Sequence, residues 1–265
     1  MASPSSRRGR RKRLLAGGLD FLAAPALVAV ILLIWQACVP LFDISPFILP
    51  TPYAVLQRLF QDYQLLAAHG QVTLLEVVLG FGLAAVVGVA LSLAIFYFRP
   101  VEKALYPVLV GLQTVPKAAL APLLVLYLGY GWAPKIFLAF LISFFPILIA
   151  TVVGLQSLDK GLIQLARSMG ASEWQMFWKI RLQAALPNVF GGFKVGISLA
   201  VIGAIIGEYV AAEKGLGYLQ LQANSQFDTT LNFASIIVIS LIGMLLYWVL
   251  NRIEDLVVYR KEKPQ

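Results

Sequence analysis

Six long apolar stretches constrain what this chain can fold into more than any other feature. Each is close to the roughly 20 residues that an α-helix needs to cross the hydrocarbon core of a bilayer. Charged residues make up 13% of the chain, against roughly 25% in a typical soluble domain. The sequence therefore predicts an all-α, polytopic membrane helix bundle. Its six transmembrane helices are expected at about 21–40, 72–98, 105–128, 134–154, 189–212 and 231–250.

The distribution of positive charge predicts the orientation of these helices. Cytoplasmic loops of membrane proteins carry an excess of Lys and Arg. Residues 1–13 are rich in Arg and contain no acid, and a basic run directly before an apolar span marks the cytoplasmic side more often than a nucleic-acid contact. Of the 21 Lys and Arg residues, the exceptions to the cytoplasmic segments are Arg58, Lys117, Lys135 and Lys214. Both termini are therefore expected in the cytoplasm.

The same alternation predicts the organisation of the chain. A basic cytoplasmic tail at 1–20 precedes a single membrane domain at 21–250, and a cytoplasmic tail at 251–265 follows it. The segment 41–71 falls on the outer side. Its proline-rich start and helically spaced apolar residues indicate a short interfacial helix.

The cytoplasmic segment 155–188 predicts a helix-turn-helix elbow. Apolar residues recur at helical spacing before Gly170, and aromatic residues do so after it. Gly170 suits the reversal, because glycine adopts left-handed backbone conformations without a steric cost. Ser172 and Gln175 are spaced as a capping box, in which each side chain bonds the other residue's amide.

This elbow resembles the loop of ABC-importer permeases whose signature is Glu-Ala-Ala, three residues, Gly, nine residues, Ile, one residue and Leu-Pro. The matches are Ala166, Gly170, Ile180 and Leu182, while Gln164, Leu165 and Gln183 depart from the pattern. The resemblance implies a coupling loop that docks into a groove of a separate ATPase subunit. The residues expected to carry this coupling are Gln164, Ala166, Gly170, Ala171, Ser172, Trp174, Ile180 and Leu182.

Other stretches resemble the permease subfamily that imports nitrate, sulfonates, taurine, thiamine-pyrimidine precursors or riboflavin. They are the run from Thr114 to Leu123, Phe144-Phe145-Pro146-Ile147, and Gly215-Leu216-Gly217-Tyr218-Leu219. The resemblance covers about residues 49–250. It implies a bacterial inner-membrane permease, a multi-pass protein working as a homodimer with an ATP-binding cassette subunit and an extracytoplasmic substrate-binding protein.

The candidate translocation path is Lys117, Gly203, Gly207 and Glu208. Prolines break the third apolar stretch around Lys117, and ionisable residues within a membrane are functional candidates by default. The fifth stretch is rich in Gly and Ala, which allow close helix approach. It is expected at the path or at a dimer seam. Glu208 has structural alternatives, namely reaching the outer interface or pairing with a neighbouring lysine.

Motifs for chemistry are absent from the sequence. It contains no Gly-x-x-x-x-Gly-Lys-Ser/Thr phosphate loop, no metal-spaced His/Cys cluster and no nucleophile–base–acid set. We therefore expect no catalytic or metal site, no cofactor, ATP bound by the partner subunit, and no nucleic-acid partner. A proton-coupled secondary carrier that uses Glu76, Lys117 or Glu208 is the alternative, although no internal repeat of the kind frequent in carriers is found.

Overall fold

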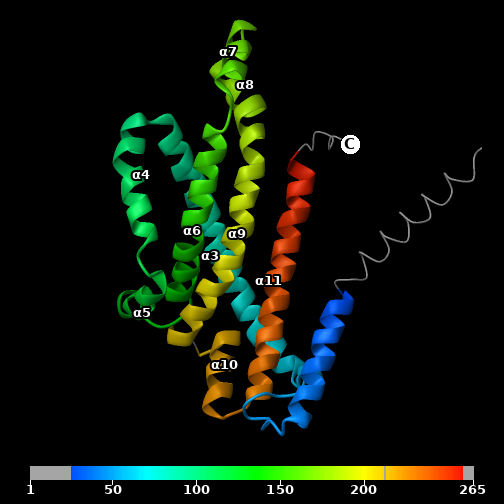
Figure 1. Ribbon diagram of the computed structural model, residues 1–265. Coiled ribbons are helices and arrows are strands. Elements are labelled where there is room, and N and C mark those ends of the chain that lie inside the picture. Colours follow the sequence, from blue (N-terminus) through cyan, green and yellow to red (C-terminus); the bar gives the residue numbers. More distant parts are fainter. Residues whose placement is uncertain (1–24, 212, 259–265) are drawn as a thin grey trace, which may run out of the picture. The chain divides into compact units, whose positions relative to one another are not determined.

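The computed structural model describes residues 25–211 and 213–258, and all regular structure in these ranges is helical (Figure 1). The predicted all-α fold is confirmed for this part of the chain. The elements are an apolar helix Pro25–Leu41, α2 Pro52–Gln61, α3 Tyr63–Tyr97, α4 Arg99–Gln113, the 3-10 helix η1 Lys117–Leu120, α5 Ala121–Leu128, α6 Trp132–Gln156, α7 Lys160–Ser168, α8 Glu173–Met176, the π-helix η2 Phe177–Arg181, α9 Leu182–Ala211, α10 Leu216–Ser225 and α11 Thr229–Val257. The predicted tail 1–20 lies outside the described residues, and α11 runs on into the predicted tail 251–265.

Four described helical stretches are long and apolar enough to cross a membrane, where the sequence predicted six. They are α3, α6, the continuous run Glu173–Ala211 and α11. The third predicted stretch forms two helical pieces, Pro107–Gln113 and Lys117–Leu128, which meet at 83°. The first predicted stretch is described only from Pro25 and forms a shorter apolar helix. Length and composition therefore support four spans directly, and a fifth if the bent pair counts as one.

The chain divides into two compact units. Among the described residues, the first comprises 25–63 and 223–234, and the second comprises 64–211, 213–222 and 235–258. In the first unit α2 begins as its sequence predicts, because the Thr51 hydroxyl accepts a hydrogen bond from the Ala54 amide (3.2 Å) and proline occupies the first turn. Arg58 then pairs with Asp62 and Asp228 at 2.6 and 2.7 Å.

In the second unit, small residues let α3, α6 and α9 pack backbone to backbone. A Cβ added at Gly80 of α3 would lie 2.6 Å from the Cβ of Ala139 on α6. One added at Gly203 of α9 would lie 2.7 Å from the Ala139 Cα, and one at Gly192 would lie 2.6 Å from the Ala150 Cβ. The small residues of α3 and α9 are therefore packed against α6 of the same chain. Such close packing is expected in a membrane, where no hydrophobic driving force brings helices together.

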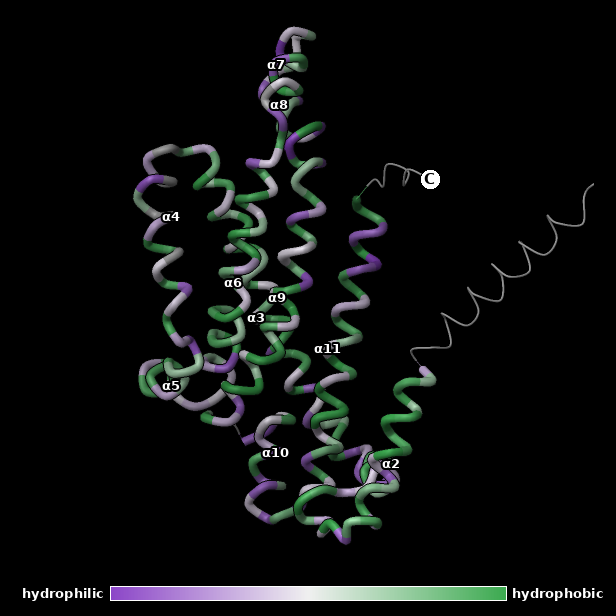
Figure 2. Tube along the Cα trace, viewed as in Figure 1, coloured by the Kyte–Doolittle hydropathy of each residue, from purple (hydrophilic) through white to green (hydrophobic). Residues whose placement is uncertain are grey.

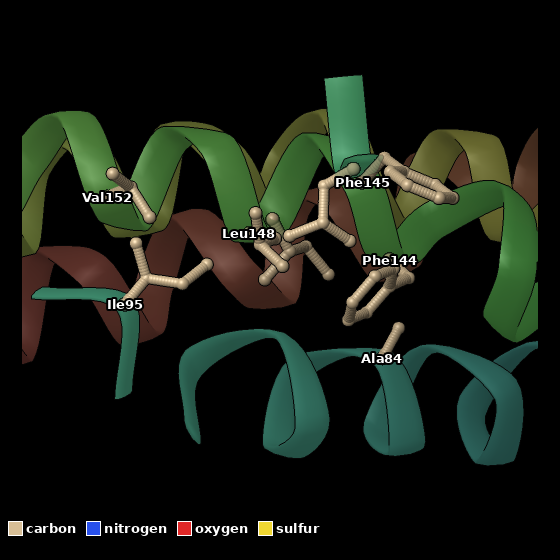
Figure 3. Close-up of a cluster of buried hydrophobic side chains, with 8 residues drawn as sticks. Ala84, Ile95, Phe144, Phe145, Leu148 and Val152 are labelled. Atoms are coloured by element: carbon tan, nitrogen blue, oxygen red, sulfur yellow. The ribbon is translucent and has the colours of Figure 1, made fainter. Parts of the chain in front are cut away.

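A hydrophobic cluster fills the contact between α3 and α6. Figure 3 shows Ala84 and Ile95 of α3 directed at a row of α6 side chains that includes Phe144, Leu148 and Val152, all of them buried. The hydropathy colouring of Figure 2 follows the same division, since α6 and α9 are mainly apolar along their middles while hydrophilic residues appear on α7 and α8. The apolar stretches thus form the body of this unit, and α7 with α8 extends from one end of it.

Candidate functional site

The elbow predicted for segment 155–188 forms by local backbone chemistry. Asp159 caps α7, because its Oδ1 accepts hydrogen bonds from the amides of Gly161 (2.6 Å) and Leu162 (3.2 Å). The helix ends when Gly170 takes φ +80°, and the Ala171 amide then donates back to the Ala166 carbonyl at 3.1 Å. The predicted left-handed glycine is confirmed.

The second arm of the elbow starts with the predicted capping box. The Gln175 amide donates to Ser172 Oγ (3.2 Å), and the Ser172 amide donates to Gln175 Oε1 (3.1 Å). The helix then passes through the π-turn η2 into α9 without a break. Because the elbow continues directly into a membrane-length helix, a displacement of the elbow acts on α9.

Two further contacts hold the elbow together, and neither was predicted from the sequence. Arg167 donates to Glu173 Oε1 from Nη2 (2.9 Å) and Nε (3.1 Å), and this ion pair bridges the turn at Gly170. Arg181 lies over the Phe96 ring at 5.0 Å, which fastens the second arm to the end of α3. The opposite charges of Arg167 and Glu173, on either side of Gly170, are the sequence signal that could have predicted their ion pair.

The elbow exposes a group of large apolar side chains. Met169 and Trp174 are 79% and 71% exposed, and Leu165 and Trp178 are also exposed. Ala166 is buried, so this matched position supports the elbow from within; Gln164 is exposed, and Ile180 and Leu182 are half-buried. Neighbouring exposed apolar side chains of this size mark an interaction surface.

Lys117 lies at the break in the third apolar stretch. Its ammonium donates to the Gln113 carbonyl at 2.8 Å, so it caps the C-terminal end of α4, and it sits 4.7 Å from the centre of the Phe145 ring. It also lines a cavity of about 600 Å³ with residues of α6 and with Leu199 of α9. The ionic partners found in the described ranges do not include one for Lys117.

Glu208 is buried and directed into the protein, rather than reaching an outer interface. Its Oε1 accepts from Thr73 Oγ1 (2.6 Å) and its Oε2 accepts from the Gly217 amide (2.5 Å). Glu76 lies beside it and forms an ion pair with Lys135 of α6. The sequence placed Lys135 outside the cytoplasmic segments, and its side chain is only 4% exposed.

The cavity at Lys117 is lined by none of the other three candidate path residues. Gly203 and Gly207 face α6, where a Cβ at Gly207 would lie 2.9 Å from the Lys135 Cα. Lys117 meets α6 at Phe145, ten residues from Lys135, or ~15 Å along a helix. The structure therefore accounts for both glycines by helix packing, and a role of the four residues in transport stays a prediction.

These features define a class: a polytopic helical membrane protein with an elbow that exposes apolar side chains and extends from its membrane-length helices. A family model described as "Binding-protein-dependent transport system inner membrane component" matches residues 82–263. The chain belongs to this family, and it is the permease subunit of an ABC importer. The resemblance seen in the sequence is confirmed, and the secondary-carrier alternative is set aside.

Characterised and predicted permeases are similar along nearly the whole chain. A probable ABC transporter permease protein of Haemophilus influenzae is 40% identical over 230 residues, covering 85% of this chain and 94% of the relative. A riboflavin transport system permease protein of Chloroflexus aurantiacus is 39% identical, covering 89% of each. A formylaminopyrimidine transport permease protein of Halalkalibacterium halodurans is 34% identical, covering 88% and 94%.

The fold is shared with a solved transporter. An inward-facing structure of the MetNI methionine ABC transporter aligns with a TM-score of 0.65 and 19% identity, covering 75% of this chain and 99% of that one. At this identity the likeness concerns the fold alone.

Proposed function

We propose that this permease works as a homodimer and that its elbow docks on a separate ATP-binding cassette subunit. The observation that carries the proposal is the elbow itself, in which Gly170, the Ser172 capping box and the Arg167–Glu173 pair hold an exposed apolar surface in one geometry. Closure of the ATPase pair on ATP would move the elbow, and α9 would carry that motion into the membrane. An extracytoplasmic binding protein would deliver the solute, and no hydrolytic chemistry would reside in this chain.

The proposed topology has six crossings, with both termini and the elbow on the cytoplasmic side of the plasma (inner) membrane. The excess of Lys and Arg in the segments on that side supports it. The helix Pro25–Leu41 and the bent pair that ends at Leu128 would supply the two crossings beyond the four long helices. The loop before α6 and the start of α10 would then face outward.

The proposed substrate is a small polar or anionic solute of the sulfonate, nitrate, taurine, pyrimidine-precursor or riboflavin class. Relatives named for formylaminopyrimidine and riboflavin transport support this range, as does a taurine transport system permease protein of Escherichia coli at 31% identity. Lys117 supports the anionic members, because it presents a cation at the wall of a cavity.

A cross-linking experiment tests the docking of the elbow. A photoreactive thiol reagent attached to Ala171→Cys, in a Cys38→Ala background, should form a covalent adduct with the co-expressed ATPase subunit, since Ala171 lies in the turn beside exposed Met169 and Trp174. The matched control is Tyr130→Cys, which is exposed but lies in the loop before α6. An ATPase adduct at position 130 and none at 171 would refute the docking.

Lys117→Gln is expected to raise the KM for an anionic solute roughly tenfold or more, because a hydrogen bond to a charged group is worth ~1.5–3 kcal/mol. Uptake into proteoliposomes that contain the assembled transporter measures the effect. Lys103→Gln is the matched control, because Lys103 is exposed on α4. An unchanged KM for every anion tested would remove Lys117 from the substrate path.

A further inference from the structure

A buried cluster with unequal charges joins α3, α6 and α9 at the end of the second unit opposite the elbow (Figure 1). Its members are Glu76, Lys135 and Glu208, whose exposed fractions are 0%, 3% and 1%. Two acids and one base thus lie almost fully buried in one cluster. An uncompensated charge in such surroundings costs far more than one at the surface, so the charge balance of this cluster has to be closed in some way.

The hydrogen bonds and the ion pair of the cluster show which of its charges has no counter-ion. Both carboxylate oxygens of Glu208 have a hydrogen-bond donor, because one accepts from the Thr73 hydroxyl and the other from the Gly217 amide. Glu76 has its ion pair with Lys135, but neither of its oxygens accepts a hydrogen bond from another donor among the described residues. The cluster thus holds two carboxyl groups and one ammonium, and in the described part of the chain Glu208 has hydrogen-bond donors but no cation as its partner. One bound proton would close this balance, because a protonated carboxyl group is neutral and can donate a hydrogen bond.

We propose that the Glu76–Glu208 pair binds one proton, which makes the Glu76–Lys135–Glu208 cluster electrically neutral. Two carboxylates buried in one cluster do not both ionise readily, and the proton that they bind belongs to the pair rather than to either residue. The site is thus a proton-binding site, and it is separate from the elbow and from Lys117.

The other charged and titratable groups around the cluster do not replace this proton. His69 of α3 is engaged with Gly215, with its Nδ1 2.9 Å from the carbonyl oxygen and 3.1 Å from the amide nitrogen. Glu213 and Lys214, of opposite sign and both exposed, line a cavity of about 350 Å³ that Lys135 also borders. The Tyr209 hydroxyl donates to Gln220 (2.5 Å) rather than to an acid of the cluster. Water in this cavity can reach the cluster at Lys135 and exchange the proton there.

The bound proton fixes the connection between α9 and α10. The backbone at Gly215–Gly217 lies directly on the cluster: Gly217 donates to Glu208, and Leu216 donates to Thr73 Oγ1 at 2.8 Å. Gly215 has φ +122°, and a Cβ there would overlap the Glu208 carboxyl group. Loss of the proton would leave two adjacent negative charges. Glu76 is held by Lys135, so Glu208 would move and release Gly217.

Infrared spectroscopy of the purified, full-length permease tests the proposal. In an ester-free maltoside detergent at pH 7.5, where solvent-exposed acids are ionised, the carbonyl stretching band of a protonated carboxylic acid should remain. Glu76→Gln and Glu208→Gln should each abolish it, because either variant leaves one acid opposite one lysine. The matched control Glu254→Gln removes an acid that pairs with Lys194 and is 21% exposed, and it should keep the band.

Thermal unfolding of the same proteins provides an independent readout. Glu208→Gln keeps the Glu76–Lys135 ion pair and should unfold close to the wild-type temperature, while Glu76→Gln/Glu208→Gln should unfold at a clearly lower temperature, because Lys135 then has no acid. Absence of the protonated-acid band in the wild type overturns the proposal, and so does its survival in both single variants. Glu208→Gln unfolding as early as the double variant also contradicts it.

Discussion

Gly170→Val is expected to uncouple ATP hydrolysis from transport while the membrane helices remain folded. Gly170 sits at φ +80°, where an L-residue costs roughly 1–2 kcal/mol and a β-branched side chain fits least well. The chain can relieve this strain by opening the turn, which would separate the Ser172 capping box from α7 and break the Arg167–Glu173 pair. A destabilisation of this size corresponds to a roughly 5–30-fold loss of the docking-competent elbow.

The measurements are co-purification of the ATPase subunit and the ratio of ATP hydrolysed to solute taken up in proteoliposomes. Gly82→Val is the matched control, because Gly82 lies within α3 and a Cβ there would meet no atom within 4 Å. Gly82→Val should retain both properties. If Gly170→Val binds its ATPase and transports at the wild-type ratio, the elbow is not a rigid lever.

Lys135→Met should give a large loss of stability. The substitution keeps the volume of the side chain and removes the cation from Glu76, so two buried acids are left without a counter-ion. Removing one partner of a buried ion pair costs about 3–5 kcal/mol. At about 2–4 °C per kcal/mol for a chain of this size, the apparent Tm should fall by at least ~6 °C.

Lys194→Met is the matched control for this prediction. Lys194 also pairs with an acid, Glu254, but both side chains keep about a fifth of their surface exposed, and pairs nearer the surface contribute about 0–1 kcal/mol. Thermal unfolding in detergent compares the two variants. Equal, small changes in Tm would mean that the Glu76–Lys135 pair is not a buried ionic contact.

The elbow could be predicted almost residue by residue, because its determinants are local. A helix cap involves residues within three or four positions, as Ser172 and Gln175 show, and a left-handed turn needs only glycine at one position. The contacts that fasten the elbow were not predicted in the same way. Arg181 and Phe96 lie far apart in the sequence, and the residues next to them do not indicate that they make contact.

The predictions of the membrane spans also divide into features set by the local sequence and features set by packing. Apolar length identified α3, α6, α9 and α11, because crossing a bilayer requires a minimum number of apolar residues whatever their neighbours are. Length did not reveal that the third stretch bends by 83°. Prolines invite a break, but its angle depends on the packing around it, here on contacts such as that of Lys117 with Phe145.

The sequence by itself determined that this protein is helical, that it belongs in a membrane, and that Gly170 and Ser172 form an elbow, because each property depends on composition or on neighbours within one helical turn. Only the tertiary structure decided which surfaces meet. It assigned the small residues of α9 to α6, and it brought Glu76, Lys135 and Glu208 together from three helices. Helix periodicity fixes which residues share a face but not which face it packs against, and burial of opposite charges depends on that choice.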